Sequence, residues 1–287
     1  MPDIPHLVLG ATSLIGRFLL PRLERSGAPF VAVSRAPPSL ARPRRWLQAD
    51  LARLGSVAMP HASRVLSLSP IWLLPTALPA LRSAGLVRLV AFSSTSRITK
   101  IASPDPAERA VAARLAAAEA ATIAFCAEHG VRWTILRPTL IYAEDQDANV
   151  SRLAALIRRW GVLPLYGRGE GRRQPVHADD LAAAALAALD APAAENRAFD
   201  LPGGETLTYR AMCERIFAGL GRRPRILSLP PPLWRAGFAL AAPLLPGAGA
   251  AMGARMAEDL VFDAAPARAA LRWSPRPFHP RFDQGRR

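Results

Sequence analysis

The sequence predicts a doubly wound α/β fold, and three observations support this prediction. Short apolar runs alternate with helical stretches through the first half of the chain. These runs are apolar at consecutive positions, which is typical of strands buried on both faces of a parallel sheet. The first run ends in a glycine-rich turn that leads directly into a helix. Right-handed crossovers between such strands place helices on both faces of the sheet.

The strands and helices of the first half can be assigned in order from this pattern. We expect strands at 6–9, 30–33, 46–47, 64–68, 86–92 and 131–136. One helix is expected from Leu14 to Ser26, ending at Gly27, and an alanine-rich helix from Ala107 to His129, ending at Gly130. These elements predict a sheet-containing domain over residues 1–150.

The pattern changes after about residue 143, where we expect a smaller C-terminal lobe over residues 151–287. Helices are expected at 150–160, 178–189 and 208–220. Asp179 or Asp180 is expected to cap the second of these, because a carboxylate can accept the free N–H groups at a helix start. A short strand at 198–201 is expected to return to the main sheet through Phe199.

Charge and cysteine content limit the classes of function. The 287 residues carry a formal net charge of +15, but Lys100 is the only lysine and the arginines are scattered. This diffuse charge suits an anionic small molecule better than nucleic acid, which we do not expect as a partner. Two cysteines exclude a disulfide framework or a thiolate zinc cluster, and we expect no metal site. No secretory signal is recognised at the start, so we expect a cytoplasmic protein.

One later stretch raises the question of a membrane. Residues 236–254 contain no charged side chain. They are long enough to span a bilayer by length alone, but they are mostly alanine and glycine and include Pro243 and Pro246. We therefore favour a packed or interfacial helical pair, with contact to a membrane surface through residues 230–256 as an open alternative.

The glycine-rich turn, Gly10-Ala-Thr-Ser-Leu-Ile-Gly16, has the context of a dinucleotide site. A glycine at the strand end permits the tight turn, the helix start directs N–H groups at a pyrophosphate, and the last glycine allows close helix–strand packing. Ser13 stands where a middle glycine is usual. The motif predicts a Rossmann-type site with cofactor contacts from Gly10, Thr12, Ser13, Leu14, Ile15 and Gly16.

The second strand ends at Ser34-Arg35, which favours NADP over NAD. An NAD pocket usually places a carboxylate here for the ribose hydroxyls, whereas an arginine suits the 2′-phosphate of NADP. The alternative is an ordinary solvent-exposed arginine. Later strand ends are expected to contact the adenine and its ribose through Asp50, Leu51, Ser67, Leu68 and Ser69, although Asp50 also suits a turn or helix cap.

Four segments together resemble the extended short-chain dehydrogenase/reductase superfamily, of the NAD-dependent epimerase/dehydratase kind. The turn at 10–16 resembles its glycine fingerprint, and Ala91-Phe-Ser-Ser-Thr-Ser96 resembles the strand that delivers a catalytic Ser or Thr. Leu136-Arg-Pro-Thr-Leu-Ile-Tyr142 resembles its Arg-Pro motif, which implies a cofactor contact at Pro138. Arg173-Gln-Pro-Val-His-Ala-Asp-Asp180 resembles the segment that opens a later helix. The order and spacing match over nearly the whole chain.

The chain departs from that superfamily at its catalytic Tyr-x-x-x-Lys pair. In the superfamily, the lysine lowers the pKa of the tyrosine so that the phenol can act as an acid or base. Lys100 is the only lysine here, and the residue four positions earlier is Ser96. If the alanine-rich helix is aligned on Glu119, the expected tyrosine and lysine fall at Val111 and Leu115. The chain therefore resembles the atypical branch of the superfamily, which includes members that bind a dinucleotide structurally.

Other groups remain as candidates for catalysis and substrate binding. Ser94, Thr95 and Lys100 lie at or near the expected strand end. Arg172 and Arg173 are expected to hold an anionic small-molecule substrate, with pairing to carboxylates of the second lobe as the alternative. Three interpretations stay open. The first is an oxidoreductase or epimerase with non-standard acid/base residues, the second a catalytically silent NADP-binding structural or regulatory protein, and the third a peripheral membrane protein. The sequence leaves the substrate and the oligomeric state open.

Overall fold

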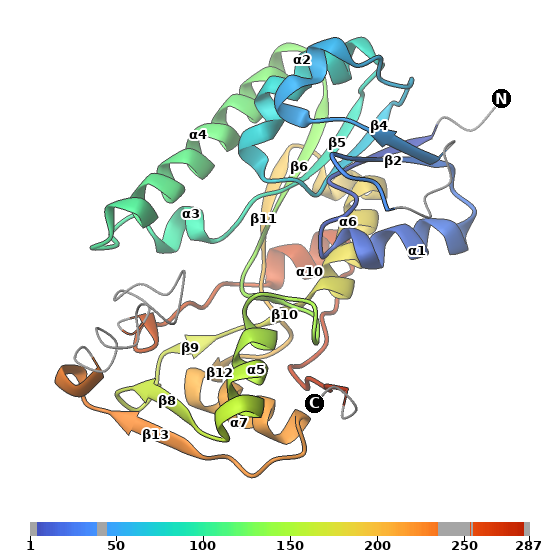
Figure 1. Cartoon of the computed structure of the whole chain (residues 1–287). Coiled ribbons are helices and arrows are strands. Elements are labelled where there is room, and N and C mark those ends of the chain that lie inside the picture. The colour runs from blue at the N-terminus through green and yellow to red at the C-terminus, as the bar shows by residue number, and fades with distance from the viewer. Residues whose placement is uncertain (1–4, 39–44, 235–252, 254, 284–287) are drawn as a thin grey trace.

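The computed structural model describes residues 5–38, 45–234, 253 and 255–283, and shows two packed parts (Figure 1). The larger part, at the top of the view, is a sheet between two layers of helices. The smaller part, below it, combines helices with short strand pairs.

The main sheet has seven parallel strands in the order β11-β6-β5-β4-β1-β2-β3. The chain runs outward from β1 to β3 and then continues on the other side of β1, so the winding reverses between β1 and β4. In a doubly wound sheet, ligands bind at the carboxyl ends of the strands at this point. The strands are β1 (His6–Leu9), β2 (Phe30–Ser34), β3 (Trp46–Gln48), β4 (Arg64–Ser67), β5 (Arg88–Phe92), β6 (Arg132–Pro138) and β11 (Arg197–Leu201).

Helices cover both faces of the sheet, as Figure 1 shows. One face is covered by α1 (Gly16–Ser26), α6 (Ala178–Asp190) and α10 (Ala265–Leu271), which share an apolar core cluster with the sheet. The other face is covered by α2 (Leu74–Ser83) and α4 (Pro106–Glu128), which contribute to a second cluster. The short helix α3 (Ser96–Thr99) joins β5 to α4.

The small lobe has its own apolar core, built around α5 (Val150–Trp160) and α7 (Tyr209–Gly219). Three two-stranded sheets complete it or connect it to the main sheet. Their strands are β7 (Ile141–Tyr142), β8 (Leu163–Tyr166), β9 (Arg172–Arg173), β10 (Val176–His177), β12 (Leu207–Thr208) and β13 (Ile226–Leu229).

The sequence pattern located the seven strands of the main sheet and the helices α1, α4, α5, α6 and α7 to within a few residues, and it missed other elements. The α/β class and the parallel sheet are confirmed, and Phe199 lies in β11, which pairs with β6. The pattern missed α2, whose Pro75 and Pro79 are more typical of loops, and it also missed β13. The capping prediction for α6 was wrong. The cap is His177, whose extended backbone lets its ring accept the Asp179 N–H.

One helix in the described part of the chain, α4, is long and apolar enough to cross a membrane by length and composition. Its buried side packs on the main sheet through Leu115, Ala118 and Cys126. The stretch that raised the membrane question, 236–254, lies outside the described residues except for Gly253.

Candidate functional site: a dinucleotide turn and a degenerate catalytic edge

The turn between β1 and α1 requires glycine at both ends. Gly10 has a φ of +70°, and a Cβ there would lie 2.5 Å from the Ser69 hydroxyl and 2.8 Å from its backbone nitrogen. A Cβ on Gly16 would overlap the Ala11 carbonyl oxygen. Side chains are therefore excluded at both positions, and α1 approaches β1 as closely as a dinucleotide fold demands.

The rest of the turn is arranged to receive an anion. The Ser13 hydroxyl accepts the Gly16 N–H at 3.2 Å, so Ser13 supports the helix start at the place of the usual middle glycine. Within the described residues, the N–H groups of Leu14 and Ile15 have no hydrogen-bond partner. Free N–H groups at a helix start favour a pyrophosphate, so the residues present fit a dinucleotide.

On the side of the site expected to bind the adenine, one arginine is exposed and several polar side chains form hydrogen bonds within the chain. Arg35 is exposed directly after β2, and its carbonyl accepts a hydrogen bond from the Gln48 side chain at 3.0 Å. The Ser34 hydroxyl lies 2.9 Å from that of Thr12 and so ties β2 to the turn. Asp50 caps the short helix at 51–56 by accepting the Ala52 N–H at 3.1 Å, which is the alternative role considered for it.

Residues 67–69 lie at the carboxyl end of β4, the strand beside β1 at which the winding of the sheet reverses. Ser67, Leu68 and Ser69 are all buried, and the Leu68 N–H donates to the Leu9 carbonyl at 2.9 Å. The Ser67 hydroxyl has no partner among the described residues. Leu51 is buried in the second core cluster. The Ser67 hydroxyl is therefore a buried polar group that a ligand could satisfy, whereas Leu51 and Leu68 are apolar.

The hydroxyls at the end of β5 are mostly engaged. Thr95 is buried, and both its hydroxyl and its N–H donate to the Pro138 carbonyl, at 3.1 and 3.2 Å. The Ser94 hydroxyl accepts the Ser96 N–H at 3.1 Å and remains partly exposed. Thr95 therefore fixes the strand ends to each other, and Ser94 is the hydroxyl with more freedom to meet a ligand.

Val111 and Leu115, where the alignment on Glu119 places the superfamily's acid–base pair, are apolar and differ in exposure. Val111 is 38% exposed, whereas Leu115 is 3% exposed and packs in the second core cluster. The Nζ atom of Lys100 lies 3.5 Å from the Glu108 carboxylate. Glu108 also pairs with Arg255 of the C-terminal segment. Lys100 and Glu108, the candidate proton carriers near this edge, therefore form an ion pair with each other.

A buried polar network, which the sequence analysis did not identify, lies where α4 meets the carboxyl ends of β5 and β6. Glu119 accepts hydrogen bonds from the Arg137 guanidinium at 2.5–3.2 Å and from the Ser93 hydroxyl at 2.6 Å. Arg97 forms an ion pair with the same carboxylate at 3.2 Å. Two features of the sequence could have indicated this network: Glu119, which served only to align the helix, and the Arg-Pro motif. The network shows that this Arg-Pro motif fastens the helix to the sheet.

Asp200 lies beside this network but accepts no hydrogen bond from it at its Oδ1 atom. Its Oδ1 has no hydrogen-bond partner among the described residues, and the Arg137 guanidinium is 3.9 Å away. Burial raises the pKa of Asp200, Arg137 opposes this rise, and Glu119 adds to it. Asp200 is therefore a carboxyl group that resists ionisation at the carboxyl edge of the sheet.

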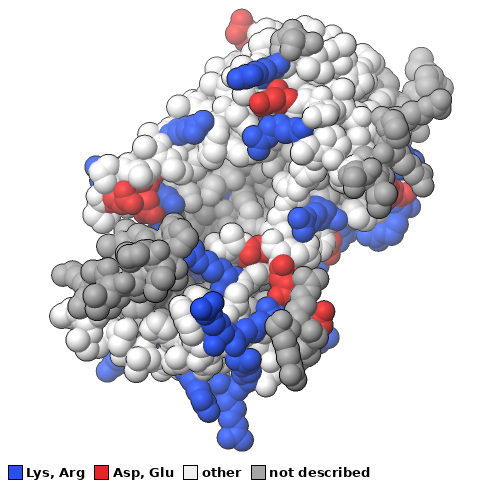
Figure 2. Space-filling model, viewed as in Figure 1, with Lys and Arg blue, Asp and Glu red and all other residues white. Residues whose placement is uncertain are grey.

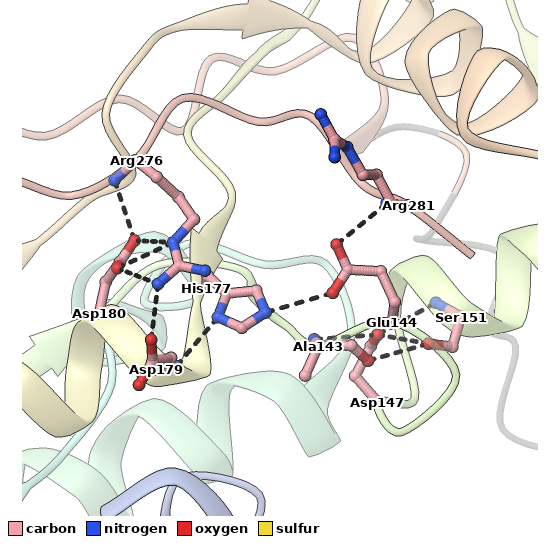
Figure 3. A network of polar contacts seen from close by, with 9 residues as sticks. All are labelled: Ala143, Glu144, Asp147, Ser151, His177, Asp179, Asp180, Arg276 and Arg281. Atoms are coloured by element: carbon pink, nitrogen blue, oxygen red, sulfur yellow. Dashed lines mark hydrogen bonds and ion pairs between the residues drawn. The ribbon is translucent and has the colours of Figure 1, made fainter. Parts of the chain in front are cut away.

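A second network, shown in Figure 3, surrounds His177 at the start of α6. The Nδ1 atom accepts the Asp179 N–H at 3.0 Å, which places the ring proton on Nε2, 3.2 Å from the Glu144 carboxylate. Burial alone would raise the pKa of Glu144, but hydrogen bonds from His177 and from the Arg281 N–H outweigh it and hold that pKa below its ordinary value. His177 therefore links the 143–149 loop to α6.

The same network joins three distant segments through the first turn of α6. Asp179 pairs with Arg22 of α1 and with Arg276, each at 2.7 Å, and Asp180 pairs with Arg276 at 2.8 Å. Burial raises the pKa of Asp179, but the hydrogen bonds from Arg22 and Arg276 lower this pKa by more than burial raises it. The pKa of Asp179 therefore lies below its ordinary value. These contacts hold the C-terminal segment across the junction of the two parts.

The arginines expected to meet a substrate are used within the chain. Arg172 is exposed and pairs with Asp259 at 2.7 Å. Arg173 is 5% exposed and donates to the backbone carbonyls of Arg172, Arg255 and Glu258. This differs from the expected substrate contact, because the guanidinium secures the segment at 253–260. In the described part of the chain, no group of three or more His, Cys, Asp or Glu is placed to hold a metal ion.

Comparisons with known proteins agree with this geometry. Residues 76–201 match the NAD dependent epimerase/dehydratase family. The glycine turn lies outside the matched segment, so the turn supports the family independently. Two curated relatives are the mitochondrial "NADH dehydrogenase [ubiquinone] 1 alpha subcomplex subunit 9" proteins of Arabidopsis thaliana, 34% identical over 105 residues, and Dictyostelium discoideum, 25% identical over 93 residues. The matched segments span 36% and 32% of this chain and 26% of each relative.

Solved structures share the fold over nearly the whole chain. MoeE5 in complex with UDP-glucuronic acid and NAD has a TM-score of 0.73 at 21% identity, covering 96% of this chain and 94% of that one. A short-chain dehydrogenase/reductase superfamily protein from Agrobacterium tumefaciens with bound NAD has a TM-score of 0.71 at 16% identity, covering 96% and 93%. UDP-glucose 4-epimerase from Thermotoga maritima has a TM-score of 0.69 at 16% identity, covering 95% and 94%. These structures confirm the predicted fold, and the match over residues 76–201 supports the resemblance to the epimerase/dehydratase family.

Proposed function

Because this chain carries a domain of the NAD-dependent epimerase/dehydratase family in an NAD(P)-binding Rossmann-type fold, we propose that it binds NADP as a structural or regulatory ligand. A bound dinucleotide would supply hydride chemistry, but apolar Val111 and Leu115 stand where the alignment on Glu119 places the superfamily's proton carrier and its lysine. The observation that carries the proposal is the pair Val111 and Leu115, of which Leu115 is buried in the apolar core.

The surroundings of the other candidate acid/base groups also support this proposal. Thr95 donates to a backbone carbonyl, and Lys100 is held by Glu108. Tyr142 is fully buried, and burial raises the pKa of its phenol well above the ordinary value. A general acid or base must be free to reach the reacting atom, whereas Thr95 and Lys100 are engaged within the chain and Tyr142 is buried.

The preference for NADP rests on Arg35. Its exposed guanidinium follows the second strand, where a carboxylate would favour NAD. The curated relatives are named as subunits of a larger enzyme, which supports a role as a bound component of an assembly. The cofactor would then stabilise the fold by mass action, because only the folded chain presents the glycine turn.

Ligand-dependent melting tests the binding. At about one hundred times its Kd, a dinucleotide adds about 2.7 kcal/mol to the free energy of unfolding, so the melting temperature should rise by several degrees with NADP and less with NAD. An unchanged melting temperature with every dinucleotide at millimolar concentration would contradict cofactor binding.

Hydride transfer tests the silent site separately. We expect no oxidation of NADPH above background with a panel of aldehydes and ketones, and no epimerisation of UDP-glucose. A second candidate function, a reductase or epimerase with unusual residues, is favoured by the partly exposed Ser94 hydroxyl and by the hollow that Figure 2 shows between the two parts. Turnover that is lost in Ser94→Ala would establish this second function.

A further inference from the structure

The small lobe presents an outward sheet face that is apolar. Strands β8 and β13 are parallel, with Leu163 opposite Ile226 and Pro164 opposite Leu227. Because side chains alternate between the two faces of a strand, Leu163 and Leu165 point into the lobe core, and both are buried. Pro164 and Leu227 therefore share the outer face, where Leu227 is 53% exposed.

Further large apolar side chains lie close to this face. Trp160 is 52% exposed and Val162 is 38% exposed, and both directly precede β8. Leu233, 60% exposed, lies in the helical segment at 231–234, which follows β13. The next residue, Trp234, packs against Tyr166 with ring centroids 6.2 Å apart, which brings this segment to the end of β8. We call Trp160, Val162, Leu227 and Leu233, with the arginines described next, the β13 face.

Among the arginines around these side chains, three form no ion pair with a carboxylate in the described part of the chain. The Leu163 N–H donates to the Arg225 carbonyl at 2.9 Å, and Arg222 donates to the carbonyls of Ile157 and Arg158, so 157–163 and 222–226 lie side by side. In the part of the chain that the structure describes, Arg159, Arg223 and Arg225 form no ion pair and are exposed. Residues 151–176 and 203–234 together contain eleven arginines and three acidic residues. The lower end of the lobe in Figure 2 shows basic side chains and no acidic ones.

We propose that the β13 face docks on an anionic lipid surface. A tryptophan and aliphatic side chains flanked by arginines match the boundary between headgroups and acyl chains, where the rings and leucines enter the interface and the guanidinium groups meet phosphates. A second copy of this chain would bring like charges together. Nucleic acid binding uses stacked aromatic rings, whereas three of the four apolar side chains here are aliphatic.

Vesicle co-sedimentation tests the proposal with the full chain. We expect binding to vesicles of phosphatidylcholine containing one third phosphatidylserine, weak binding to phosphatidylcholine alone, and loss of binding at high salt. Each arginine near an anionic surface contributes about fivefold, so Arg223→Gln with Arg225→Gln should weaken partitioning about 30-fold. Trp160→Ser with Leu227→Ser should weaken it about tenfold or more.

A matched control separates this face from the diffuse net charge. Arg82→Gln with Arg268→Gln removes the same charge from exposed positions on the larger part of the molecule and should bind as the unchanged chain does. All substituted side chains are exposed, so melting temperatures should stay close to that of the unchanged chain. Equal binding to both vesicle types, or full binding by both β13-face variants, would overturn the proposal. Binding to poly-glutamate or RNA without binding to anionic vesicles would likewise overturn it, in favour of an acidic protein or a nucleic acid.

Discussion

The two ends of the proposed dinucleotide cleft differ in how closely their residues match those of the superfamily. At the β1–α1 turn, Gly10 and Gly16 stand where any side chain would collide with the backbone or with Ser69. At the α4 edge, Val111 and Leu115 are apolar where the alignment on Glu119 places an acid–base pair, and Leu115 belongs to the core. Because a glycine turn for a pyrophosphate and a helix that delivers a proton are distinct elements, the first can be kept when the second is lost.

The largest effect is expected from Gly16→Val. A side chain at this position overlaps the Ala11 carbonyl oxygen already at its Cβ atom, so α1 must move away from β1. We expect a loss of about 3 kcal/mol or more in the free energy of unfolding, together with loss of dinucleotide binding. Urea unfolding and dinucleotide titration measure both. Ala120→Val, at an exposed position of α4, is the control; a Gly16→Val chain that binds normally would show that the turn does not hold the cofactor.

Leu115→Lys probes the other end of the comparison. Burying an ammonium group in the second core cluster should cost roughly 3 kcal/mol or more, whereas Ala117→Lys, exposed on the same helix, should cost little. Val111→Tyr should be tolerated because that position is 38% exposed. The double variant restores the superfamily's pair on one helical face, since i and i+4 are neighbours. Equal stability of the two lysine variants would mean that position 115 opens into the cleft.

Glu144→Gln tests the network in Figure 3 through acid stability. The folded pKa values of Glu144 and Asp179 lie below the ordinary 4.5 and 3.8, so the unfolded chain binds more protons in this range. Their stabilisation is present above these values and is lost as the pH falls through the folded pKa. Urea midpoints from pH 7 to pH 3 should fall less steeply in Glu144→Gln, which should also lose about 2 kcal/mol at neutral pH. A parallel pH profile would assign the acid sensitivity elsewhere.

Arg35→Asp should have the smallest effect, confined to the choice of cofactor. Exchanging a cation for a carboxylate beside the 2′-phosphate should lower the ratio of NADP to NAD affinity by about tenfold, or about 1.4 kcal/mol. Stability without ligand should not change, because Arg35 is exposed. Binding titrations with both dinucleotides measure the ratio, with Arg82→Asp as the control. An unchanged ratio would mean that Arg35 faces solvent.

Local features of the site could be predicted from the sequence, and long-range ones could not. The glycine turn is a continuous strand–turn–helix, and the missing pair is visible because its two positions lie one turn apart on one helix. The cap by His177, by contrast, depends on Glu144, and the role of Arg276 depends on Asp180, 96 residues earlier. The burial of Arg173 also required the fold, because its partners at 255 and 258 are backbone carbonyls with no sequence signature.

The position of β11 constrains how the chain can be assembled during synthesis. Its five residues pair with β6 at a separation of about sixty residues, after the chain has passed through the first half of the small lobe. The outer edge of β6 therefore stays open until residue 201 has left the ribosome, and α6 reaches its place on the sheet only shortly before. Because non-local pairing must wait for distant partners, the edge of β6 stays exposed while about sixty further residues are made, and we expect the nascent chain to be prone to aggregation during this interval.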